Sequence, residues 1–133
     1  MKNSQLSTLN SPLSSKGPLW IKSFSFALRV VKLAKYLQDE KKEYVLSKQL
    51  LRSGTSIGAL VREAEHAESK PDFAHKMNIA LKEASETLYW LELLHQAEYI
   101  TEQRYESIRT DSEELVKLLV SIVKTTKASI RAQ

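Results

Sequence analysis

One segment carries most of the information about how this chain folds: Gln49-Leu-Leu-Arg-Ser-Gly-Thr-Ser-Ile-Gly-Ala-Leu-Val-Arg-Glu-Ala64. Its apolar residues have the spacing of a helix, yet two glycines, Gly54 and Gly58, lie within it. A glycine inside a helix costs about 1 kcal/mol relative to alanine. Because the neighbouring side chains are also small, this part of the helix presents little bulk. We therefore predict that another backbone packs closely against it.

The overall composition favours a helical protein with a single domain. The chain has 133 residues, of which 42% are hydrophobic, with three glycines, three prolines and no cysteine. The lack of cysteine excludes a disulfide framework and a thiolate zinc site, and it agrees with the expected cytoplasmic location. No apolar run approaches the roughly 18 residues of a membrane span. Neither a membrane partner nor a cofactor is expected.

Charge is unevenly distributed along the chain. The first 52 residues hold ten Lys or Arg and three Asp or Glu, a net charge of +7, within a total of +4. The remaining residues hold ten basic and thirteen acidic side chains, a net charge of −3. A basic N-terminal half can attract phosphate backbones. A solvated, lysine-rich surface explains the same asymmetry equally well.

Hydrophobic periodicity predicts four amphipathic helices after a flexible leader at 1–19, which is rich in Ser, Asn, Pro and Gly. The helices are expected over 23–37 and 44–66, from Ser69 to about residue 95, and from a cap at Thr101 onward. We find no strand alternation. Short connections between four such helices predict an all-α, antiparallel up-down-up-down four-helix bundle over 20–133.

The expected faces of these helices differ in kind. In the first helix, Phe24, Leu28 and Val31 are placed on the inward face. The third helix has a second apolar ridge beside its main stripe, formed by Ile79, Trp90, Leu93 and Leu94. Two ridges on one helix indicate burial on two sides, and hence an interface with a partner or with another subunit. Tyr89 and Trp90 cannot share one direction, so one is expected inside and the other at an interface.

A long motif runs through the second and third helices. It reads Gln49-Leu-x-Arg-Ser-Gly-Thr-Ser-Ile-Gly-Ala59, then Arg62-Glu-Ala64, Asp72-Phe73, Lys76, Ala80-Leu-Lys-Glu-Ala84, Glu86-Thr87 and Tyr89-Trp-Leu91. This motif resembles that of the four-helix-bundle proteins encoded by intervening sequences of 23S ribosomal RNA genes. The resemblance covers about residues 20–128. The leader departs from it, and so does Leu60, where the family pattern has Asn.

The resemblance implies a small cytoplasmic bacterial protein that forms a ring-like homopentamer and has no established enzymatic activity. That family is similar in fold to the accessory variability determinant of diversity-generating retroelements, which binds nucleic acid and a reverse transcriptase. The expected function is accordingly non-enzymatic. The expected partners are further copies of the chain, with RNA, DNA or another protein as additional candidates.

Candidate nucleic-acid-binding residues cluster in the first helix and just after it. Tyr36 lies among the basic residues and is expected to stack on a base. The set comprises Lys22, Arg29, Lys32, Lys35, Tyr36, Lys41, Lys42 and Lys48.

A second set of residues is expected to serve packing between helices or between subunits. It comprises Gly54, Ser56, Gly58, Glu83, Glu86 and Trp90. Arg52, Arg62 and Ser56 on the second helix can face Glu83 and Glu86 on the third. Such a polar network would fix the register between two helices or between two subunits.

The alternative function is a metal-dependent enzyme with a carboxylate and histidine site inside the bundle. Two Glu-x-x-His pairs support it, Glu63 with His66 and Glu92 with His95. Di-metal sites in four-helix bundles combine two such pairs with one inward glutamate from each remaining helix. The first helix has no acid before Asp39, so the ligand set is incomplete. These four residues remain weak candidates for metal ligands.

Overall fold

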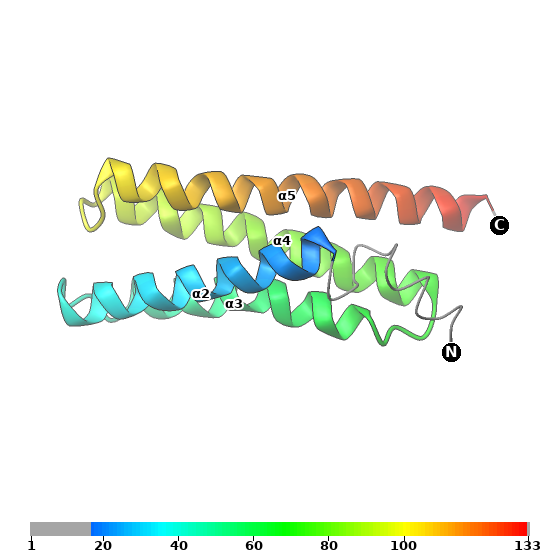
Figure 1. Ribbon diagram of the computed structural model, residues 1–133, viewed down its shortest axis with the longest axis horizontal. Coiled ribbons are helices and arrows are strands. Elements are labelled where there is room, and N and C mark those ends of the chain that lie inside the picture. The colour runs from blue at the N-terminus through cyan, green and yellow to red at the C-terminus, as the bar shows by residue number, and fades with distance from the viewer. Residues whose placement is uncertain (1–16, 133) are drawn as a thin grey trace.

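The computed structural model describes residues 17–132, which form four α-helices. Along the chain these are α2 (Pro18–Asp39), α3 (Leu46–Ala64), α4 (Lys70–Gln96) and α5 (Glu102–Arg131) (Figure 1). No strand occurs within this part of the chain. The leader expected at 1–19 lies outside the described residues except at its last three positions.

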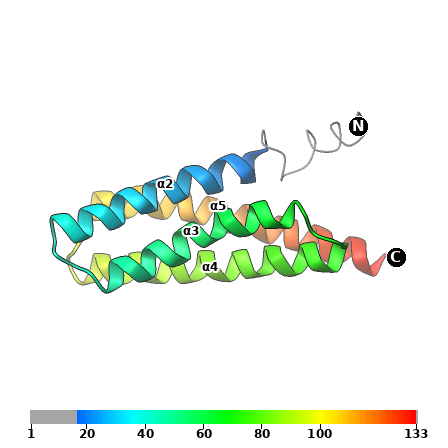
Figure 2. The ribbon, with the colours of Figure 1, turned by 90° about the horizontal axis from the view of Figure 1, so that it is seen from below.

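Successive helices run in opposite directions and pack side by side, so the structure is an all-α four-helix bundle, as the sequence predicts (Figures 1 and 2). α3 packs against both α2 and α4, and α4 packs against α5. α2 and α5 close the fourth side with fewer contacts than the other three neighbouring pairs. The last turns of α5 extend beyond the start of α2 (Figure 1).

Local hydrogen bonds define where three of the helices begin. The Ser69 hydroxyl accepts from the Asp72 N–H at 3.2 Å, and the Thr101 hydroxyl accepts from the Arg104 N–H at 3.2 Å, which confirms both predicted caps. At α3, the buried Glu43 carboxylate accepts backbone N–H groups of residues 45–47 at distances of 2.7–3.2 Å. These bonds satisfy free N–H groups at the positive end of the helix. They place the start of α3 two residues later than predicted.

The first helix begins earlier than the sequence suggested. α2 starts at Pro18 rather than near residue 23, and Leu19 is fully buried. Gly17 and Pro18 looked like part of a loop, but proline is favoured in the first turn of a helix, where its missing N–H would be unpaired anyway. Residues 18 and 19 therefore belong to the bundle and not to a leader.

The core runs along the bundle axis and draws on all four helices. α2 contributes Phe26, Val30 and Leu37, each at most 1% exposed. The predicted inward face of this helix is therefore wrong in part. Phe24, Leu28 and Val31 point outward and remain 45–48% exposed. The whole helix is rich in apolar residues, so periodicity alone selected a stripe rotated away from the true core face.

The two glycines of α3 lie where α2 approaches most closely. A Cβ atom added at Gly54 would come within 2.7 Å of a Val30 methyl group, and one added at Gly58 would lie 3.3 Å from the Ser23 carbonyl oxygen. The second contact is with backbone, as the sequence predicts. The small residues of α3 thus allow the tight α2–α3 packing.

The second ridge expected on α4 is largely covered within the chain itself. Leu94 is fully buried, while Ile79, Trp90 and Leu93 are half-buried. Tyr89 points outward and is 56% exposed, whereas Trp90 packs against the core. Across the described residues, none of the helices combines the length and apolarity that crossing a membrane requires.

Candidate functional site

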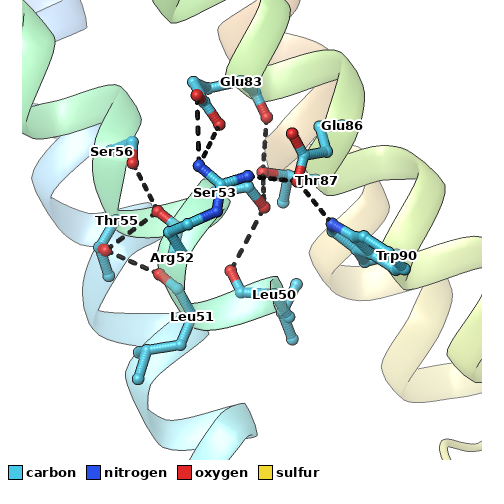
Figure 3. A network of polar contacts seen from close by, with 10 residues as sticks. All are labelled: Leu50, Leu51, Arg52, Ser53, Thr55, Ser56, Glu83, Glu86, Thr87 and Trp90. Atoms are coloured by element: carbon cyan, nitrogen blue, oxygen red, sulfur yellow. Dashed lines mark hydrogen bonds and ion pairs between the residues drawn. The ribbon is translucent and has the colours of Figure 1, made fainter. Parts of the chain in front are cut away.

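Polar residues of α3 and α4 meet in one network. Arg52 on α3 forms ion pairs with both Glu83 and Glu86 on α4, which lie one turn apart (Figure 3). The Trp90 indole N–H donates to the Glu86 carboxylate at 2.9 Å. The sequence left open whether this network joins helices or subunits. In this structure it joins two helices of one chain.

A smaller pair of hydroxyl groups lies beneath the Arg52 network. Thr87 and Ser53 are both fully buried, and their hydroxyl oxygens are 2.9 Å apart. The Thr87 hydroxyl also lies 2.7 Å from the Glu83 carbonyl oxygen. A buried hydroxyl without a partner is costly, so this contact favours a single register between α3 and α4. Ser56 takes no part, because its hydroxyl donates to the Arg52 carbonyl within α3.

The network lowers the pKa of Glu86 below its ordinary value, through the hydrogen bond from Trp90 first and the one from Arg52 second. A carboxylate with a lowered pKa stabilises the folded state at neutral pH, and this contribution is lost as the pH falls. We expect Glu86→Gln to flatten the loss of stability on acidification below about pH 4.5, the ordinary glutamate value. Urea denaturation at several pH values measures this slope. Glu65→Gln serves as the control, and an equal flattening by both variants would contradict the assignment.

The structure divides the predicted nucleic-acid-binding residues into separate groups. Two of the cations are paired with acids of α5. Lys22 contacts Glu114 at 3.0 Å, and Arg29 contacts Asp111 at 2.6 Å. These pairs bridge the loosely packed side between α2 and α5, so part of their charge is already neutralised.

A groove lies on the same side, with a volume of about 580 Å³. Its polar lining comes from Arg29 and Lys32 of α2 and from Gln103, Arg104 and Ser107 of α5. Arg104 is a residue that sequence reasoning missed. Its guanidinium group lies over the Tyr36 ring, 4.0 Å from the centroid, so one face of this ring is already covered. The remaining basic candidates, Lys35, Lys41, Lys42 and Lys48, are exposed outside the groove.

An apolar ridge follows the outward face of α2. Ile21, Phe24, Leu28 and Val31 are 49%, 48%, 48% and 45% exposed. Their spacing of three and four residues aligns them along one side of the helix. One side chain of this outer α2 ridge is flanked by α3, since Arg62 lies over the Phe24 ring at 4.9 Å. A continuous row of exposed apolar side chains is typical of an interaction site.

The two Glu-x-x-His pairs do not converge. Glu63 lies 3.9 Å from Lys76 near the start of α4. Glu92 and His95 lie near the end of this helix, roughly 24–28 Å further along at 1.5 Å per residue. The His95 ring instead stacks on Tyr105 with centroids 4.4 Å apart. No cluster of three or more acid or histidine side chains suited to a metal occurs among residues 17–132. The proposed combination of these four residues in one metal site is therefore wrong.

Comparison with known proteins agrees with the motif and the fold. The family described as 23S rRNA-intervening sequence protein matches residues 16–121. The chain belongs to this family. The matched residues include all of α3 and α4, and with them Arg52, Glu83 and Glu86 of the network described above. No curated protein matches the chain.

A solved structure similar to this member of the 23S rRNA-intervening sequence proteins comes from Bacteroides thetaiotaomicron VPI-5482. It is a protein of unknown function from the S23 ribosomal protein family, determined at 1.70 Å resolution. The two chains share 62% sequence identity, with a TM-score of 0.79. The match covers 80% of this chain and 98% of the other.

Proposed function

We propose that this protein is a non-enzymatic, cytoplasmic member of its family that assembles with copies of itself into a homopentamer. The observation that carries the proposal is the outer α2 ridge. Four large apolar side chains, each nearly half exposed, lie in a row on a helix whose opposite face already fills the core. Burial of such apolar surface stabilises an assembly by about 25 cal/mol for each Å² removed from water. The number five comes from the family resemblance.

Light scattering coupled to size exclusion tests the assembly. We expect the wild-type chain to elute with five times its 15.2 kDa mass. Leu28→Glu should reduce this mass to that of one chain, because the substitution would bury an unpaired carboxylate in the interface. Its fold should survive, since Leu28 is 48% exposed in the isolated bundle. A wild-type protein that stays monomeric at every concentration would refute the proposal.

A second candidate function is binding of a nucleic-acid backbone in the groove between α2 and α5. Lys32 of α2 and Arg104 of α5 both line it, and among the described residues neither forms an ion pair. Contacts between these cations and the phosphate groups of a nucleic acid do not depend on nucleotide sequence. They weaken as the salt concentration rises. In a pentamer the groove would recur five times, so weak contacts would reinforce one another.

Fluorescence anisotropy with generic RNA and duplex DNA over a salt series tests this binding. We expect binding at low salt that weakens as salt rises, and a loss of at least tenfold in affinity for Lys32→Glu combined with Arg104→Glu. The control combines Lys124→Glu with Lys127→Glu, which changes the net charge equally but lies far along α5. Equal losses in both double variants would exclude the groove, and no binding at low salt would exclude the function.

A further inference from the structure

We infer that the outer α2 ridge of one chain docks into the groove between α4 and α5 of a second copy. The interface therefore joins two unlike faces. This inference rests on the proposed self-association and specifies the surfaces that produce it.

The surface that docks combines apolar bulk with positive charge. Lys35 follows Val31 by four residues and Leu28 by seven, so it continues the outer α2 ridge toward the end of the helix. Lys32 flanks the same ridge. Both lysines are exposed, and neither forms an ion pair with another described residue. The acids of α5 pair with Lys22 and Arg29 but not with Lys32 or Lys35. The part of α2 around these two lysines therefore stays positively charged.

The receiving surface has the opposite charge and a concave shape. A groove of about 530 Å³ runs between α4 and α5. Its lining consists of Ser85, Leu88, Tyr89, Glu92, Tyr105, Glu106, Arg109 and Glu113. Three carboxylates therefore accompany a single guanidinium group. Arg109 forms ion pairs with Glu106 and Glu113, whereas Glu92 has no ion pair among residues 17–132.

Tyr89 gives this groove the character of a protein interface. Tyr89 is 56% exposed, and its ring packs edge-on against that of Trp90, with centroids 5.0 Å apart. Trp90 is fixed in turn by its hydrogen bond to Glu86. The polar network therefore holds an exposed aromatic ring in place beside Leu88. Aromatic residues and arginine are enriched in the centres of protein interfaces, and this groove supplies both.

The two surfaces complement each other in shape and charge. In the docked arrangement the outer α2 ridge lies against Tyr89 in the groove of the second copy. Lys32 and Lys35 beside the ridge then approach Glu92 of that groove. Complementary charge sets the orientation of docking and disfavours other partners. Within one chain the surfaces cannot meet, because α2 packs against α3 and α5 while its ridge points away from the bundle. Repeated contacts between unlike faces form a ring when the rotation closes.

Two variants with one broken surface each test this arrangement. Leu28→Glu breaks the ridge and keeps the groove, whereas Tyr89→Lys breaks the groove and keeps the ridge. We expect each variant alone to be monomeric by light scattering. An equimolar mixture should form a heterodimer with the mass of two chains, because only one intact interface can form between them. Both positions are about half exposed, and circular dichroism verifies that each variant retains its helices.

Val45→Glu provides the matched control. Val45 is 71% exposed and belongs to neither surface, so this variant should assemble like the wild type. Assembly of the Tyr89→Lys protein on its own would overturn the inference. The outer α2 ridge would then bind a surface other than the groove, such as the same ridge of another copy. The proposed self-association would survive that result. A monomeric wild-type protein, by contrast, would refute both.

Discussion

Phe26→Ala should lower the free energy of unfolding by about 3–5 kcal/mol, the usual cost of removing a phenylalanine from a core. Phe26 is 1% exposed and belongs to the cluster that joins all four helices. The substitution removes most of the apolar area of the side chain and leaves a cavity that the surrounding helices fill only in part. Urea denaturation followed by circular dichroism measures the change.

Phe24→Ala is the matched control for this prediction. Phe24 lies only two positions away but is 48% exposed, and Arg62 lies over its ring. Its loss should cost less than about 1 kcal/mol, because an exposed cation–π contact is worth about that much at most. Both substitutions are best compared in the Leu28→Glu background, since assembly itself adds to apparent stability. Equal costs would mean that the core face of α2 is assigned incorrectly.

Gly54→Leu should destabilise the bundle by about 2 kcal/mol. Overpacking of a tight core costs up to about 3 kcal/mol, whereas replacing a helical glycine returns about 1 kcal/mol. Even a single added carbon at this position would lie 2.7 Å from a methyl group of the fully buried Val30. Valine is stiff about its first side-chain torsion and cannot move aside easily. Thermal or urea denaturation gives the magnitude.

A double-mutant cycle identifies the cause of this loss. Val30→Ala removes the two methyl groups that an added Cβ would meet, so Gly54→Ala should cost less in the Val30→Ala background than in the wild type. If the two substitutions are additive, the close approach of α2 and α3 does not explain why α3 contains glycine at this position.

Much of the fold and part of the candidate site could be predicted from the sequence because their signals are local. The caps at Ser69 and Thr101 depend on residues within one turn. The glycines of α3 predicted a close approach of backbones, and the approach occurs at Gly58. Arg52 was expected to face Glu83 and Glu86, and it does. Arg62, which was expected there too, lies over Trp20 and Phe24 of α2 instead.

The features that the sequence did not reveal depend on contacts between distant segments. α2 is apolar around most of its circumference, so its inward and outward faces differ only in which neighbours they meet. The pairing of Arg29 with Asp111 and the position of Arg104 over Tyr36 likewise arise from the approach of α2 to α5. No pattern within either helix specifies that approach. The outer α2 ridge could be recognised only after the core had been located.

The side of the bundle between α2 and α5 has a dynamic consequence. Its two ion pairs join side chains that are 40–51% exposed, and such pairs contribute little to stability. Local opening in a folded protein starts where buried apolar contacts are fewest. Hydrogen exchange of backbone amides should therefore be faster in α2 than in α3 and α4. We expect the first helix to open away from the last while it stays packed against its glycine-bearing neighbour.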